Sequence, residues 1–264
     1  LYTARAMYYR VKNHFPHEKV FIAVVIQKMV NSEVAGVMFS VNPVSQDANE
    51  ILIEASYGLG EAVVSGAITP DEYSVKKKGF VVEKKTIAKK TWMYIRDPQT
   101  LITVKVDVPL ARQEEESLHA KEIRQLAEYA VKLEEHYKKA QDIEFAVEKG
   151  KVYITQTRAI TTLKKRDVQK EEVVEKKKLE ERKDLPQELE IKDAQLLVSG
   201  IPASPGIGRG KVVIVHDVSD LKKVQKGDVL VARMTTPDHV VAMERAEAIV
   251  TDAGGSTCHA SIVS

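Results

Sequence analysis

The stretch DIEFAVEKGKVYITQTR (residues 142–158) decides the fold of the first part of this chain. Apolar and polar residues alternate on both sides of Lys149-Gly150. A glycine-containing pair between two alternating runs is typical of a tight hairpin turn. The sequence therefore predicts two antiparallel strands that are joined at this pair.

Four polar side chains of this hairpin are candidates for a common site. By the period of two, Asp142 shares one face of the first strand with Glu144. Gln156 shares one face of the second strand with Arg158, and neighbouring strands bring such positions side by side. Spacing alone does not separate such a site from an ordinary solvated strand face.

The rest of the first part alternates apolar runs with turn signals, which predicts an α/β (α+β) fold. The expected strands cover residues 19–30, 33–43 and 50–56, followed by a glycine-bearing turn at 57–61 and a hairpin at 71–88 that turns at Lys78-Gly79. Apolar residues at helical spacing predict a helix over residues 110–138. Residues 1–163 are thus expected to form one domain.

Two further parts follow. Residues 164–196 are mostly charged with balanced signs and contain Pro186, so we expect a partly helical linker. Residues 197–264 alternate strands with a helix and predict a small α/β domain. Its expected elements are a loop leading into a strand (200–215), strands at 227–232 and 247–252, and a short helix at 237–246.

Composition excludes several function classes. The chain has 264 residues, of which 44% are hydrophobic and 30% charged, and its net charge of +2 argues against a nucleic-acid partner. It has no membrane-span pattern and no signal-peptide pattern, and its single cysteine suits a reducing compartment. We therefore expect a cytoplasmic protein, and the richness in lysine and glutamate is typical of thermophiles.

The stretch TDAGGSTCHASIV (residues 251–263) is the second candidate site. Two glycines let backbone amides approach an anion, and Ser256 or Thr257 can cap a following helix. His259 would then lie in the first helical turn, where free N–H groups keep its ring neutral and favour a phosphoryl group. An ordinary first-turn histidine fits the spacing as well.

This stretch resembles the phosphohistidine signature of the phosphoenolpyruvate-utilising enzymes, T-D-x-G-G-x-T-[SC]-H-A-[AS]-I. ASPGIGRGKVVIV and GDVLVARMTTPDHVVAM resemble earlier segments of the same swivelling β/β/α domain, although the family usually has tryptophan where His239 stands. The resemblance implies that His259 accepts and carries the phosphoryl group, with Thr257 beside it in the catalytic motif. The domain would be truncated at its C-terminal end.

The first part resembles the nucleotide-binding domain of archaeal phosphoenolpyruvate synthases, also called pyruvate, water dikinases. VVIQKMVNSEVAGVMFSVNP, EASYGLGEAVVSGAITPDEYSV and DIEFAVEKGKVYITQTRAIT carry this likeness, which implies an ATP-grasp-like domain without its N-terminal half. The resemblance assigns Arg158 to catalysis and Glu144 and Gln156 to Mg²⁺. It places these side chains at the nucleotide: Gln27, Met29, Glu54, Asp142, Glu144, Gln156 and Arg158.

The implied reaction converts ATP, pyruvate and water to AMP, phosphate and phosphoenolpyruvate through a phosphohistidine. The pyruvate site would lie in a barrel domain outside this chain, so the fragment is expected to be inactive alone. Neither nucleic acid nor membrane is an expected partner, and a homo-oligomer of the full-length enzyme stays an option. Alternatives are a pyruvate phosphate dikinase, a rifampicin-type phosphotransferase and a phosphohistidine carrier that does not itself catalyse.

Overall fold

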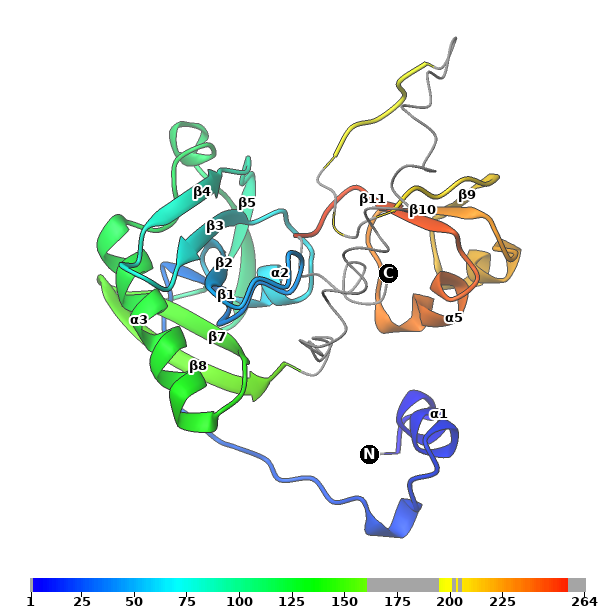
Figure 1. Cartoon of the computed structure of the whole chain (residues 1–264), viewed down its shortest axis with the longest axis horizontal. Helices are drawn as coiled ribbons and strands as arrows, with labels where there is room; N and C mark the ends of the chain where they lie inside the picture. The colour runs from blue at the N-terminus through cyan, green and yellow to red at the C-terminus, as the bar shows by residue number, and fades with distance from the viewer. Residues whose placement is uncertain (1, 161–194, 201–202, 204–205, 256–264) are drawn as a thin grey trace, which may run out of the picture. The chain divides into compact units, whose positions relative to one another are not determined.

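The computed structural model of the chain describes residues 2–160, 195–200, 203 and 206–255 (Figure 1). Contacts divide the chain into a short unit, Leu1–Val30, and a large unit, Asn31–Ser264, and each is described by itself. The expected linker core (164–194) lies outside the described residues, and so do Thr257 and His259.

A six-stranded antiparallel sheet forms the centre of the large unit (Figure 1). Its strand order is β4-β3-β2-β1-β7-β8. The strands are β1 (Val34–Phe39), β2 (Glu50–Tyr57), β3 (Asp71–Lys76), β4 (Val82–Thr86), β7 (Gln141–Glu148) and β8 (Lys151–Ala159). The mixed α/β character predicted from the sequence is confirmed, because helices and antiparallel sheets share this unit.

Both predicted hairpins are confirmed. The strands β3 and β4 flank the turn at Lys78-Gly79, where Gly79 has a φ of 83°. The strands β7 and β8 flank Lys149-Gly150, and both residues have positive φ values, 52° and 71°. Two consecutive positive φ angles are the signature of the type I′ turn, whose twist matches that of the strands it joins.

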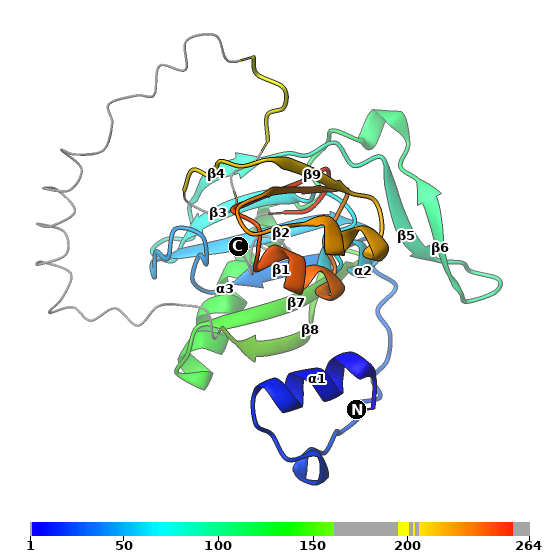
Figure 2. The same ribbon diagram turned by 90° about the vertical axis from the view of Figure 1, so that its right-hand side faces the viewer.

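Each face of the sheet is covered by a different element. The helix α3 (Ala120–Tyr137) lies along one face and buries Ile123, Leu126 and Ala130 against β1, β2 and β7 (Figure 1). The short helix α2 (Glu61–Val64) and the strand β5 (Trp92–Arg96) cover part of the opposite face. Figure 2 shows β5 and its partner β6 (Thr103–Asp107) extending together from the sheet. The face away from α3 is therefore only partly covered.

The predicted helix 110–138 begins ten residues later than expected. Only a short 3₁₀ turn, η2 (Leu110–Arg112), precedes it, and α3 starts at Ala120. The cause is a capping box, in which the Glu122 carboxylate accepts the His119 amide at 2.8 Å and the His119 side chain accepts from the N3 amide. The prediction of the start was wrong because amphipathic spacing continues upstream of the cap.

The predicted strand at residues 19–30 is wrong. The Leu1–Val30 unit holds a helix, α1 (Ala4–Lys12), and a short turn, η1 (His17–Lys19), and no strand is assigned to residues 20–30. A strand needs a neighbour that accepts and donates its backbone hydrogen bonds, and no described ladder includes this segment. Its large exposed apolar side chains are Phe21, Ile22, Val24, Val25, Ile26 and Met29.

In the described residues of the third part, strands lie where the sequence predicts them, and the helix predicted at 237–246 is a 3₁₀ turn followed by a four-residue helix. A three-stranded parallel sheet has the order β11-β10-β9, formed by β9 (Val212–Val215), β10 (Val229–Ala232) and β11 (Ala248–Thr251). The connections contain η3 (Val218–Lys223), η4 (Pro237–His239) and α5 (Val240–Met243). Among all described residues, none of the helices has the length and apolar character that crossing a bilayer requires.

Candidate functional site

Five candidate residues of the first part lie in two adjacent rows across the sheet face that points away from α3: Glu54, Asp142, Glu144, Gln156 and Arg158. The strand register sets Glu144 of β7 opposite Gln156 of β8, and Val37 of β1 separates Glu144 from Glu54 of β2. Residues that are paired across antiparallel strands point to the same face. The register therefore gathers these side chains from three strands into one row.

Direct contacts join the two cross-strand pairs. The Gln156 amide nitrogen donates to Glu144 Oε1 at 3.1 Å. In the adjacent row, Arg158 Nε donates to Asp142 Oδ2 at 2.7 Å. The Asp142 side chain is 12% exposed, whereas that of Arg158 is 66% exposed. Asp142 therefore anchors an arginine whose guanidinium still reaches solvent.

A β-bulge brings these pairs to one face. From the turn to Phe145 the register is regular, with Phe145 opposite Ile154, but Glu144 then faces Gln156. An uninterrupted hairpin would set Glu144 opposite Thr155, and Gln156 would point to the α3 side. The bulge thus re-aims the end of β8, a role that bulges often have near functional sites.

Glu144 is electrostatically suited to receive a cation. Partial burial raises its pKa above the ordinary value of 4.5, and the charge of Asp142 raises it further, while Arg158 opposes both effects. Ionising Glu144 therefore costs more here than in a fully solvated glutamate. A bound cation would relieve that cost.

The affinity for Mg²⁺–nucleotide is expected to rise as the pH rises from 4.5. Protons compete with the cation for Glu144, and the raised pKa extends this competition to higher pH than for an ordinary glutamate. Binding of magnesium adenylyl imidodiphosphate, measured by calorimetry across a pH series, checks this. The Glu144→Gln variant should lose that part of the pH dependence, and an equal slope in both proteins would contradict the assignment.

The residues present fit a Mg²⁺ ion that is shared with phosphates. In the described part of the chain, no group of three or more His, Cys, Asp or Glu side chains could hold a metal by itself. Glu144 and Gln156 instead offer a carboxylate and an amide side by side. Mg²⁺ is usually held by one or two carboxylates together with substrate phosphates.

The glycine-bearing turn after β2 is fixed by backbone contacts. Gly58 has a φ of 80°, and a Cβ there would lie 2.2 Å from the Tyr94 carbonyl oxygen. Leu59 N donates to the same oxygen at 2.8 Å, and Ser32 Oγ donates to Gly58 O at 3.0 Å. The turn therefore has a structural task, which is to seat β5 against the end of β2.

The three other residues predicted for the nucleotide site are Glu54, Gln27 and Met29. Glu54 is buried in the row described above. Gln27 and Met29 belong to the Leu1–Val30 unit, so their predicted place at the nucleotide stays a prediction. The sequence analysis missed Glu72, which lies directly opposite Glu54. The alternation in DEYSVK was the signal that could have placed it on this face.

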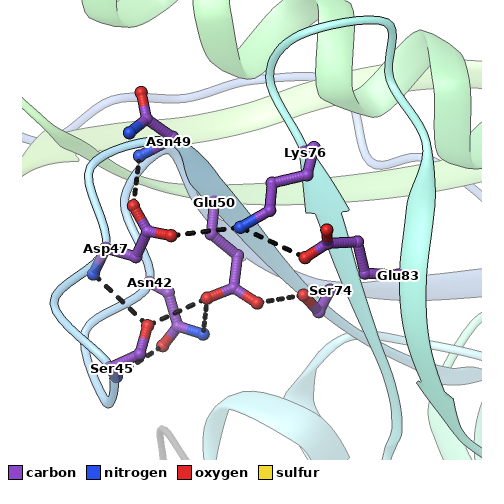
Figure 3. A network of polar contacts seen from close by, with 8 residues as sticks. All are labelled: Asn42, Ser45, Asp47, Asn49, Glu50, Ser74, Lys76 and Glu83. Carbon is purple, nitrogen blue, oxygen red and sulfur yellow. Dashed lines mark hydrogen bonds and ion pairs between the residues drawn. The ribbon is translucent and has the colours of Figure 1, made fainter.

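A polar network closes the β1–β2 loop at the end of the same face (Figure 3). Glu50 accepts from the Asn42 side chain at 2.9 Å, and Lys76 Nζ lies 3.1 Å from both Asp47 and Glu83. The network comprises Asn42, Ser45, Asp47, Asn49, Glu50, Ser74, Lys76 and Glu83. Lys76 thus pairs with two carboxylates, and Glu50 also accepts from Ser45 and Ser74, so the network braces the loop.

Comparison with known proteins places the chain in a family. Residues 1–179 match the family described as "Pyruvate phosphate dikinase, AMP/ATP-binding domain". The chain belongs to this family. Residues 224–264 match a second family, "PEP-utilising enzyme, mobile domain". The two matches follow the order of the two candidate sites.

Relatives of the family match the whole chain and confirm the resemblance seen in its motifs. A phosphoenolpyruvate synthase of Pyrococcus furiosus is 49% identical over 100% of this chain and 31% of its own length. A probable phosphoenolpyruvate synthase of Archaeoglobus fulgidus is 48% identical over 100% of the chain and 33% of its own length. The synthase of Aeropyrum pernix is 37% identical, and the chain covers 34% of it. The chain thus spans about a third of these relatives.

Proposed function

We propose that this chain is the nucleotide-binding and phosphohistidine-bearing portion of a cytoplasmic phosphoenolpyruvate synthase. The observation that carries the proposal is the gathering of Glu144–Gln156 and Asp142–Arg158 on one sheet face. Relatives named phosphoenolpyruvate synthase match the chain throughout. Residues 1–163 would form the ATP-grasp-like domain, 164–196 the linker and 197–264 a truncated swivelling domain.

The proposed reaction divides into three transfers. A ring nitrogen of His259 attacks the β-phosphorus of ATP, and the bond to the α-phosphate oxygen breaks, so AMP leaves. Water then attacks the γ-phosphorus and releases phosphate. The phosphoryl group that stays on His259 passes to the enolate oxygen of pyruvate in the part of the enzyme outside this chain. The products are AMP, phosphate and phosphoenolpyruvate.

The four polar residues Asp142, Glu144, Gln156 and Arg158 would divide three tasks in the first transfer. Glu144 and Gln156 would hold Mg²⁺, which neutralises phosphate charge when it is bound. Arg158 would swing its exposed guanidinium onto the phosphates and stabilise the charge that develops there. Asp142 keeps that arginine on the correct side of the sheet through the 2.7 Å contact.

Labelling of the full-length enzyme with ATP that carries ³²P at the β-position tests the proposal. We expect acid-labile, alkali-stable label on the wild type, because a phosphoramidate hydrolyses in acid. The His259→Ala variant should lose the label. The control is His216→Ala, because His216 is exposed and its contact with Asp220 uses only its backbone amide.

Two outcomes would contradict the proposal in different ways. Retention of label in His259→Ala would remove the phosphohistidine. Label that comes from phosphoenolpyruvate and a carrier protein, with no nucleotide required, would favour the phosphocarrier. If ATP labels the wild type but pyruvate does not discharge it, the acceptor is different, as in an antibiotic phosphotransferase.

A further inference from the structure

A fully buried ion pair lies behind the nucleotide-facing row. Lys90 Nζ and Asp71 Oδ1 are 2.6 Å apart, and both side chains have 0% exposure. Removing two charges from water costs several kcal/mol for each ion unless hydrogen bonds compensate. The pair therefore calls for a structural reason, which its other contacts supply.

The Asp71 carboxylate, at the start of β3, accepts hydrogen bonds from two other segments of the chain. Its Oδ1 also accepts the Ala88 amide at 2.9 Å, and its Oδ2 accepts the Ser117 amide at 2.8 Å. Lys90 Nζ donates to the Ala88 carbonyl at 2.8 Å as well. One buried carboxylate thus joins β3, the β4–β5 connection (residues 87–91) and the loop before α3.

Tyr73 completes the shell of the carboxylate. Its hydroxyl lies 3.4 Å from Asp71 Oδ2 and accepts the Leu118 amide at 3.4 Å. Burial raises the pKa of Tyr73, and the charge of Asp71 raises it further, so the phenol keeps its proton and can donate it. The carboxylate therefore has a compensating donor on each side.

A second ring of contacts ties the same segments together. Lys90 N donates to the Gln113 carbonyl at 2.8 Å, and Lys90 Nζ lies 5.5 Å from the centre of the Tyr57 ring. The Tyr57 hydroxyl donates to the Glu115 carbonyl at 3.3 Å, and the Arg112 guanidinium lies 4.5 Å from the ring centre. The β4–β5 connection and the loop before α3 are thereby fixed to the end of β2.

The position of the pair links it to the site. In the sheet, Asp71 pairs with Ala55, and the next pair is Glu72 with Glu54 on the opposite face. A recess on that face is lined by Glu54, Thr69, Pro70, Glu72, Thr86 at the end of β4, residues 87–89 of the connection, and Gly255. Asp71 and Lys90 are wholly buried, so they cannot touch a ligand there, but they hold the wall of the recess.

We propose that Asp71 and Lys90 are positioning residues that act as one lock. The lock holds the β4–β5 connection against the sheet and so sets the shape of the recess beside Glu54, where part of the Mg²⁺–nucleotide would lie. This inference rests on the proposed function, because it assigns the recess to the nucleotide. It adds two residues that make no contact with the substrate.

Hydrogen exchange of the full-length enzyme without nucleotide tests the lock by itself. In Asp71→Asn and in Lys90→Met, exchange in residues 86–91 and 113–118 should rise at least tenfold relative to the rest of the sheet. In the double variant, exchange in these segments should rise by less than the sum of the rises in the two single variants, because no unpaired buried charge is left. The matched control is Lys77→Met, which removes a partly exposed pair of 2.7 Å with Glu134 and should leave both segments unchanged.

Nucleotide binding tests the positioning role. The dissociation constant for magnesium adenylyl imidodiphosphate should rise at least tenfold in both single variants, fall back towards the wild-type value in the double variant, and stay unchanged in Lys77→Met. Variants that exchange faster yet bind as tightly as the wild type would overturn the positioning role. Uniformly faster exchange over the whole sheet would overturn the local lock.

The failures of this inference and of the proposed function are distinguishable. If the wild type does not bind the nucleotide analogue, the proposed function fails, and with it the assignment of the recess to the nucleotide. The exchange pattern without nucleotide still decides the lock. If the wild type binds the nucleotide analogue, and Asp71→Asn and Lys90→Met bind it as tightly as Lys77→Met does, the proposed function stands and the positioning role falls.

Discussion

Replacement of Gly36 by alanine is expected to lower the free energy of unfolding by about 3 kcal/mol or more, among the larger effects of single substitutions. A Cβ at this position would lie 1.9 Å from the Glu54 carbonyl oxygen and 2.9 Å from Ala55 Cα. Both atoms belong to the backbone of β2, so no flexible side chain can move aside. Because β1 is hydrogen-bonded to β7 on its other edge, the strand cannot shift without breaking a second ladder. Urea denaturation of the protein measures the loss.

Gly60→Ala is the matched control for this substitution. Gly60 has a φ of −63°, and a Cβ there would meet only the Ala35 methyl group at 3.5 Å, which is ordinary contact. Alanine restricts the unfolded chain, so we expect no loss and a gain of up to about 1 kcal/mol. Equal losses at both positions would show that the close approach of β1 to β2 is not what Gly36 provides.

Much of the first sheet could be predicted because its hairpins are defined locally. The Lys149-Gly150 pair adopts two positive φ angles, and alternating residues on either side continue directly into strands. Turn chemistry and strand alternation therefore agree within a few residues. The same agreement located the turn at Lys78-Gly79, where Gly79 and the following Phe80 both have positive φ angles, 83° and 56°.

The facing of the candidate site was predicted correctly, but the period of two does not explain it. Counted from the turn, a regular hairpin would set Thr155 opposite Glu144, and Gln156 and Arg158 would face the core. The bulge between Glu144 and Phe145 reverses this. The residue pattern does not reveal the bulge. With or without it, the apolar side chains near the turn are buried in the same way.

The remaining differences come from one local cap and from contacts between residues that are distant in sequence. The start of α3 depends on a capping box. The ten residues before α3 make other contacts instead, such as the hydrogen bond from Ser117 N to Asp71. Asp71 and Lys90 are nineteen positions apart and look like two surface charges in the sequence. Only the fold shows that they form one buried pair.

Glu144→Gln is expected to slow labelling by β-³²P ATP in the full-length enzyme by about 10²- to 10³-fold, the usual cost of removing one preorganised charged or polar group. Glutamine keeps the size of the side chain and a contact with Gln156, so the substitution removes mainly the charge. That charge is the one that would hold Mg²⁺ beside the phosphates. Single-turnover labelling at saturating nucleotide measures the rate of the transfer itself.

The stability of Glu144→Gln separates a functional carboxylate from a structural one. Burial and Asp142 raise the pKa of Glu144, so at neutral pH its charged form costs stability in the folded state. Removing the charge should therefore leave the protein equally or more stable while labelling fails.

The control is Glu148→Gln, which changes a carboxylate on the same face of β7, opposite Lys151, and should keep labelling within about threefold, as expected for a surface substitution. Equal losses of rate in the two variants, or loss of folding in Glu144→Gln, would reduce Glu144 to an ordinary strand residue. An inactive but stable variant is the combination that only a site built for a cation explains.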